Sequence, residues 1–157
     1  MALKVGALAP DFSLPAAPGP DRVTLSSYRG ERSVVILFFP LAFSSVCTDE
    51  MCRMAEDYSA LAELDAEVLG ISVDSPFVTQ KFAEEIGADF PILSDFNKKA
   101  IYAYDVVYEE FFGLHGVAKR SAFVVDREGV IRYAWSSDDA GVEPDYDEIS
   151  KVVAELD

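Results

Sequence analysis

The sequence has few of the residues that build metal centres, disulfide networks and basic surfaces. Its 157 residues include two cysteines and one histidine, and 13 Lys and Arg residues stand against 28 Asp and Glu residues. The net charge of −15 argues against a nucleic-acid partner, because a phosphate backbone would repel the protein. Two cysteines and one histidine leave a four-ligand zinc site incomplete, so we expect no metal and no cofactor.

Long hydrophobic runs are also missing. No apolar run approaches the roughly 20 residues that a membrane-spanning helix needs, so we expect no membrane partner. Residues 1–12 lack the long apolar segment of a secretory signal, and we therefore expect a cytoplasmic location. With 50% apolar residues the chain has enough material for a buried core, and its length suggests a single domain over residues 1–157.

The sequence does contain strand and helix patterns whose order predicts an α/β fold. Residues 34–39 are apolar without alternation, which is typical of a central strand buried on both faces. A helix from about residue 45 to 64 and a strand at 67–73 follow, and this order implies a parallel strand pair.

The remaining pattern completes the predicted fold. The expected elements are a helix with Ser75 as N-cap and Gly87 as C-cap, a short strand around 92–93, a short helix at 98–104, strands at 121–125 and 130–135, and a last helix that starts at Pro144. Residues 1–33 form an N-terminal extension of short strands and turns. We therefore expect a thioredoxin-like fold, with a mixed central sheet flanked by helices.

Cys47 lies at the junction between the predicted central strand and the first helix. A helix N-terminus has unpaired N–H groups and a partial positive charge, which stabilise the reactive thiolate. An ordinary cysteine is about 3% thiolate at pH 7, whereas one with a pKa near 6 is roughly 90% thiolate. Asp49 and Glu50, which we place in the first helical turn, oppose this effect. A cation is therefore needed, either Arg53 or an arginine that the fold brings in.

The residues around this junction resemble a known family. Pro40-x-x-x-Ser44-x-x-Cys47 resembles the peroxiredoxin active-site signature, Pro-x-x-x-Thr/Ser-x-x-Cys. The segments GALAPDFSLP, FPILSD and KRSAFVVDREGVIRYA resemble further blocks of the family, and the resemblance covers nearly the whole chain. FFPLAFSSVC is most similar to the alkyl hydroperoxide reductase E type. The resemblance implies a thiol-dependent peroxidase for hydrogen peroxide and organic hydroperoxides.

The resemblance also assigns roles to individual residues. Cys47 matches the peroxidatic cysteine, which becomes a sulfenic acid, and Ser44 matches the hydroxyl residue that contacts the peroxide. Pro40 matches the proline that limits solvent access, and Arg120 matches the arginine that stabilises thiolate and developing negative charge. Glu50 matches an acid that we expect to orient an arginine. Taken singly, each residue has an ordinary structural explanation as well, such as a strand end for Pro40 or an N-cap for Ser44.

The second cysteine, Cys52, leaves two mechanisms open. The Cys47-x4-Cys52 spacing resembles that of the Q-type, or bacterioferritin-comigratory-protein-type, peroxiredoxins. Residues five apart in an α-helix have Cα atoms roughly 8–9 Å apart, whereas a disulfide needs less than about 7 Å. Cys52 therefore resolves the sulfenic acid only if the first turn unwinds. In the alternative, an external thiol reduces Cys47. The implied reductant is thioredoxin, a glutaredoxin-like protein or a low-molecular-weight thiol.

Three rival functions start from other features. A disulfide oxidoreductase would use a C-x-x-C pair, which is absent, and a cysteine hydrolase would need His115 to meet Cys47. The apolar stretch 106–118 is ambiguous in structure and fits a non-catalytic interaction module or holdase. We interpret that stretch instead as an active-site rim or as the surface of a homodimer.

Overall fold

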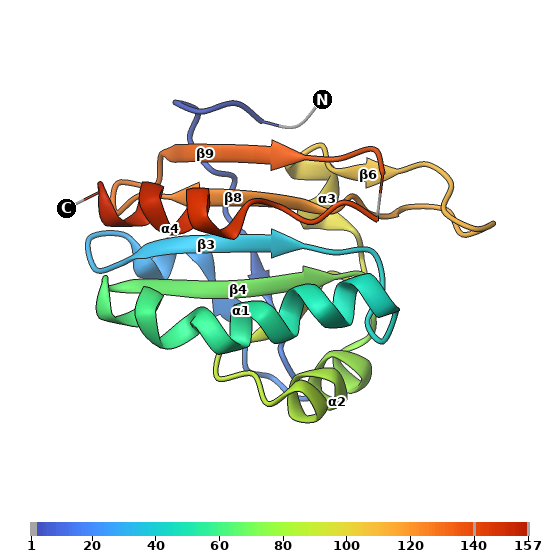
Figure 1. Ribbon diagram of the computed structural model, residues 1–157. Coiled ribbons are helices and arrows are strands. Elements are labelled where there is room, and N and C mark those ends of the chain that lie inside the picture. Colours follow the sequence, from blue (N-terminus) through green and yellow to red (C-terminus); the bar gives the residue numbers. More distant parts are fainter. Residues whose placement is uncertain (1–2, 140, 157) are drawn as a thin grey trace.

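The protein is a five-stranded sheet with helices on both sides (Figure 1). The structure, a computed structural model, describes residues 3–139 and 141–156, and within the first helix the side chains at 45–48, 50, 57, 59 and 60 lie outside the described part. The strands are β1 (Ser13–Leu14), β2 (Val23–Thr24), β3 (Ser33–Phe38), β4 (Ala66–Ser72), β5 (Ile92–Ser94), β6 (Val107–Tyr108), β7 (Val117–Ala118), β8 (Ser121–Val125) and β9 (Ile131–Ser136). The helices are α1 (Ser45–Glu63), α2 (Pro76–Ile86), α3 (Lys99–Ala103) and α4 (Tyr146–Ala154), with a 3₁₀ turn η1 (Leu25–Tyr28).

The central sheet has the strand order β5-β4-β3-β8-β9. β3 pairs with β4 in parallel, β4 pairs with β5 in parallel, and β8 is antiparallel to both β3 and β9. The predicted mixed sheet, with parallel strands first and an antiparallel pair later, is thus confirmed. β1 pairs with β2 in a separate small sheet that belongs to the N-terminal extension.

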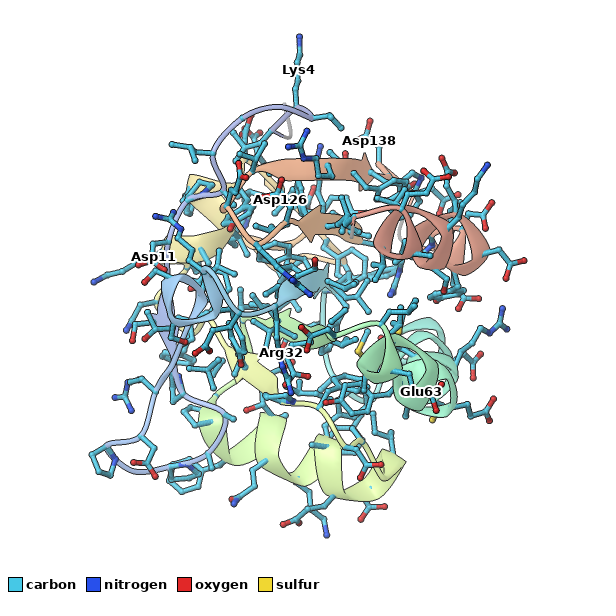
Figure 2. All side chains as sticks on the ribbon, turned by 90° about the vertical axis from the view of Figure 1, so that its left-hand side faces the viewer. Lys4, Asp11, Arg32, Glu63, Asp126 and Asp138 are labelled. Carbon is cyan, nitrogen blue, oxygen red and sulfur yellow. The ribbon has the colours of Figure 1, made fainter. Side chains whose placement is uncertain are left out.

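The central strand β3 is buried along its whole length, as its unbroken apolar run predicts. Val35, Leu37 and Phe39 face one hydrophobic cluster, which includes residues of α1, α2 and α4. Val34, Ile36 and Phe38 face a second cluster, built with the N-terminal extension and α3. In Figure 2, α1 and α4 lie together on one side of the sheet.

Local signals account for both ends of α2 and for the start of α4. The Ser75 hydroxyl accepts a hydrogen bond from Val78 N–H at 3.4 Å, and Gly87 ends α2 with φ 67°. Both caps were predicted from the sequence. The predicted start of the last helix at Pro144 is wrong by two residues, because the Asp145 carboxylate caps α4 through Glu148 N–H at 3.1 Å.

The ambiguous stretch at 106–118 is a hairpin. Its strands β6 and β7 pair through Val107 with Ala118 and Tyr108 with Val117. The connecting residues extend beyond the sheet, at the end where α1 begins (Figure 1). This end of the sheet carries the residues that the sequence assigns to chemistry.

Candidate active site

The candidate site starts where the central strand β3 ends. Phe39 and Pro40 follow β3 and both are buried, and Phe39 N–H donates to Ile71 O of β4 at 3.0 Å. Pro40 has no N–H, so it cannot continue the sheet ladder, and the chain leaves the sheet here. Residues 40–44, which we call the active-site loop, then lead directly into α1.

The active-site loop contains a strained residue that two contacts hold. Phe43 has φ 68°, in the left-handed region, which costs a non-glycine residue about 1–2 kcal/mol. Its ring packs edge-on against Phe82 of α2, with 5.1 Å between ring centroids. One residue earlier, Ala42 N–H donates to Asp74 Oδ2 at 2.7 Å. The loop is thereby attached both to α2 and to the segment that follows β4.

Ser44 occupies the N-cap position of α1 with an extended backbone, but its side chain makes no capping bond. Its hydroxyl donates instead to Leu41 O at 2.9 Å, which closes the active-site loop on itself. The N-cap interpretation of Ser44 therefore holds for its backbone position and not for its side chain. Because the hydroxyl proton is engaged, the oxygen lone pairs of Ser44 are the part that can bind a ligand proton.

Cys47 is the third residue of α1, so its backbone lies in the first turn, as predicted. The side chains of Cys47 and Glu50 lie outside the described residues. Since α1 begins at Ser45, Asp49 and Glu50 fall in the second turn, and the prediction that they belong to the first turn is wrong. The first turn carries no acidic residue, so the partial positive charge of the helix end is less opposed than expected.

Arg120 lies beside the same end of β3. It precedes β8, and the register pairs Ser121 with Phe38, so Arg120 comes level with the residues that enter the active-site loop. Its side chain is only 1% exposed, although arginine is seldom buried unless it has a partner. Sheet pairing thus brings Arg120 level with Phe39, the residue before Pro40, across about eighty positions of the sequence.

Tyr108 of β6 fixes the backbone around Arg120. The Tyr108 hydroxyl donates to Ser137 O at 2.8 Å, and Ser137 N–H donates to Arg120 O at 3.1 Å. Burial raises the pKa of the Tyr108 phenol, while a hydrogen bond from the Arg120 N–H and the charge of the guanidinium act in the opposite direction. Two hydrogen bonds through Ser137 therefore join β6, the segment after β9 and the residue before β8.

Arg53, the other candidate cation, is used elsewhere. Its guanidinium carbon lies 5.4 Å from the ring centroid of Tyr146 of α4, a cation–π distance. Arg53 thus joins α1 to α4. Of the two cations that we considered for the thiolate, Arg120 is the one that the sheet register brings to the end of β3.

Cys52 is a partly buried, free thiol in the middle of α1. Its neighbours Met51 and Met54 are buried and form the face of α1 that packs on the sheet. The Met51 sulfur would lie 3.2 Å from a Cβ at Gly70 of β4, so the missing side chain there permits this close packing. Because Cys47 and Cys52 share one continuous helix, the separation expected from helix geometry applies to their backbones.

Comparison with known proteins identifies the chain. The model of the AhpC/TSA family matches residues 5–134. Alkyl hydroperoxide reductase E of Mycobacterium tuberculosis is 40% identical over 134 residues, which is 84% of each chain. The chain belongs to the peroxiredoxin (AhpC/TSA) family. This peroxiredoxin is therefore a thiol-dependent peroxidase, as the sequence predicted.

Further relatives agree in sequence and fold. A chloroplastic 2-cysteine peroxiredoxin of Chattonella marina var. antiqua is 34% identical over 143 residues, which cover 85% of this chain and 71% of the relative. The structure resembles a peroxiredoxin-like protein from Aquifex aeolicus, with a TM-score of 0.88 and 26% identity over 99% of this chain and 89% of the other. It also resembles peroxidoxin BcpB from Mycobacterium tuberculosis, with a TM-score of 0.86 and 28% identity over 99% of both chains. The predicted thioredoxin-like fold is confirmed.

Three further features concern the histidine, metal binding and membrane-spanning helices. His115 lies in the β6–β7 hairpin, where its Nδ1 is 3.0 Å from Glu109 O. In the part of the chain that the structure describes, no three His, Cys, Asp or Glu residues are arranged to hold a metal ion. No helix within residues 3–139 and 141–156 is long and apolar enough to cross a bilayer.

Sequence reasoning missed two residues that shape this peroxiredoxin's site. Asp74 bonds to the active-site loop, and Tyr108 bonds to Ser137, whose N–H donates to Arg120 O. The sequence does contain a pattern that points to Asp74. This residue follows β4, the parallel neighbour of β3, and the carboxyl ends of neighbouring parallel strands meet at one edge of the sheet. Tyr108 had none, because its position depends on a hairpin that the sequence left ambiguous.

Proposed function

We propose that this peroxiredoxin reduces hydrogen peroxide and organic hydroperoxides through a sulfenic acid on Cys47. One observation carries the proposal: the chain reaches Cys47 in the first turn of α1, at the sheet end where Arg120 is buried. The N–H groups of a first helical turn and a buried guanidinium supply local positive potential. A protein with a net charge of −15 needs such a local source to stabilise a thiolate.

The proposed reaction forms one bond and breaks one bond. The Cys47 thiolate sulfur attacks one peroxide oxygen, and an S–O bond forms as the O–O bond breaks. The second oxygen leaves as hydroxide or alkoxide and takes a proton, giving water or an alcohol. The sulfur is oxidised by two electrons to a sulfenic acid, and the peroxide is reduced.

The surrounding residues support this reaction in different ways. Ser44 donates its proton to Leu41 O, so its oxygen is suited to accept a hydrogen bond from the peroxide O–H. The Arg120 guanidinium would stabilise the charge that develops on the leaving oxygen. Buried Pro40, without an N–H, would shield the sulfur from water. Glu50 would orient an arginine.

Cys52 is the proposed resolving residue. Its thiolate would attack the Cys47 sulfur, forming an S–S bond while hydroxide leaves and takes a proton. The first turn of α1 must unwind for this step, because an intact helix holds the two Cα atoms roughly 8–9 Å apart. Thioredoxin, a glutaredoxin-like protein or a small thiol would then reduce the disulfide, as expected in the cytoplasm, where such reductants are present. In the one-cysteine alternative, the same kind of thiol attacks the sulfenic acid directly.

Mass spectrometry of protein treated with one equivalent of peroxide tests this proposal. We expect the intact mass to fall by two hydrogens and a linked peptide to join positions 47 and 52. Cys52→Ser should instead carry one added oxygen on Cys47. A trappable sulfenic acid in the wild-type chain, without the linked peptide, would support the one-cysteine alternative. Oxidation confined to residues other than Cys47 would contradict the proposed reaction.

We further propose that the β6–β7 hairpin forms part of a homodimer surface. Phe112 is 91% exposed and Leu114 is 46% exposed near the turn, which is unusual for apolar side chains of their size. Phe111 packs against Phe112 at 4.7 Å between ring centroids, so the two rings form one apolar contact surface. Sedimentation velocity should show a dimer that Phe112→Asp dissociates. A wild-type monomer at micromolar concentration would contradict this proposal.

A further inference from the structure

Asp74 connects the active-site loop to the sheet. Its carboxylate oxygen Oδ2 accepts two hydrogen bonds at 2.7 Å, one from Ala42 N–H in the loop and one from the Ser72 hydroxyl at the end of β4. Its backbone carbonyl accepts a third bond, from the Ser94 hydroxyl of β5 at 2.5 Å. Asp74 is thus fixed by β4 and β5 and in turn fixes the loop that follows β3.

Backbone strain in the active-site loop favours its rearrangement once the bond to Asp74 is removed. Phe43 adopts φ 68° and its ring is 53% exposed, so burial of the ring compensates only partly for the backbone strain. The Ala42–Asp74 bond lies one residue before this strained position, and Ser44 lies one residue after it. Without the bond, the contact of Phe43 with Phe82 and the packing of Ala42 against the core still tie the loop to neighbouring elements.

We propose that Asp74 is a positioning residue, which holds the active-site loop and the start of α1 in the arrangement that reduces peroxide. The inference rests on the proposed role of Cys47. Like charges repel, so a carboxylate does not itself stabilise a thiolate, and we assign the role of Asp74 to its hydrogen bonds. Asp74 thus favours the first chemical step.

Four variants separate the hydrogen bonds of Asp74 from its charge. Asp74→Ala removes the acceptor for both Ala42 N–H and the Ser72 hydroxyl. Asp74→Asn keeps an oxygen acceptor and removes the charge, and Ser72→Ala removes one donor at a position that is already buried. Glu84→Gln is the matched control, since Glu84 is an exposed carboxylate on α2 and its loss removes one charge without releasing the loop.

Rapid-quench alkylation and mass spectrometry measure the two steps separately, as loss of the Cys47 thiol and as disappearance of its sulfenic acid. We expect Asp74→Ala to slow the peroxide step about tenfold while the following step stays unchanged. Asp74→Asn should restore the peroxide step to within about threefold of wild type, Ser72→Ala should fall between them, and Glu84→Gln should match wild type.

Two results would overturn the inference. One is a peroxide step in Asp74→Ala within twofold of wild type. The other is an equal slowing of both steps, with no rescue in Asp74→Asn, since a general loss of folding has that effect. Cys47→Ser is run alongside: if it still reduces peroxide, the proposed function fails, whereas an inactive Cys47→Ser beside a fully active Asp74→Ala removes only the role of Asp74.

Discussion

Replacing Tyr108 by Phe should reduce both the stability and the activity of this peroxiredoxin. The Tyr108 side chain is 9% exposed, and its hydroxyl donates to Ser137 O at 2.8 Å. Phenylalanine fills the same space but leaves the Ser137 carbonyl without this partner. A net hydrogen bond contributes about 1 kcal/mol, so we expect a loss of about 1 kcal/mol in the free energy of unfolding. That loss corresponds to a fall in Tm of about 2–4 °C for a chain of this size.

The effect on activity follows from Arg120. When its backbone is no longer fixed, the buried guanidinium is held less well, and if Arg120 has the role that we propose, its misplacement lowers the rate of the peroxide step by roughly tenfold. Urea denaturation and stopped-flow peroxide reduction measure the two effects. Tyr102→Phe is the matched control, because Tyr102 is 63% exposed and loses only a solvated hydroxyl. A Tyr108→Phe protein that unfolds and reacts like wild type would refute this account of the network.

Three further predictions concern other parts of the molecule. Ser44→Ala should slow peroxide reduction about tenfold in stopped flow, whereas Ser44→Thr, which keeps the hydroxyl, should stay near wild type. Phe82→Ala removes a fully buried ring that contacts Phe43, and should cost about 3–5 kcal/mol in urea denaturation, which a change below 1 kcal/mol would contradict. Burial raises the pKa of Asp126, but N–H groups and the Arg132 guanidinium outweigh it and hold the pKa below its usual range. As pH falls, the unfolded state therefore takes up the proton before the folded state does. The difference in free energy of unfolding between wild type and Asp126→Asn should be full at pH 7 and shrink below about pH 4. A difference that stays constant with pH would contradict this prediction.

Strand β3 and helix α2 show why so much of the fold could be predicted. A short unbroken apolar run is typical of a strand that is covered on both faces, and β3 is buried throughout. The Ser75-Pro76 start and the Gly87 end of α2 are local devices whose effect depends on few neighbours. Element order then indicated the mixed sheet, because parallel strands need a helical crossover and a hairpin gives antiparallel ones.

The hairpin at 106–118 shows where such reasoning stops. Its two strands have two residues each, and Gly113 and Gly116 both adopt positive φ, at 81° and 76°. Such short pairings depend on the neighbouring elements rather than on a periodic pattern. The start of α4 was misplaced for a related reason, since Pro144 and Asp145 both suit a helix start and only the structure distinguishes them.

The candidate site also has a part that the sequence could predict and a part that it could not. The spacing of Pro40, Ser44 and Cys47 is local, so the sequence could relate these residues to one another. Arg120 was proposed from resemblance, and its position beside β3 follows from a sheet register that no local pattern encodes. Asp74 escaped notice because a single carboxylate after a strand has many ordinary uses, and its bond to Ala42 depends on the path of the active-site loop.

The most direct test of the central claim is the rate of peroxide reduction by wild type, Cys47→Ser and Cys52→Ser, measured by stopped flow under single-turnover conditions. The proposed reaction places the whole first step on Cys47. We expect Cys47→Ser to lose peroxide reduction and Cys52→Ser to keep the wild-type rate of this first step. A Cys47→Ser protein that consumes peroxide at the wild-type rate would contradict the claim that Cys47 is the nucleophile.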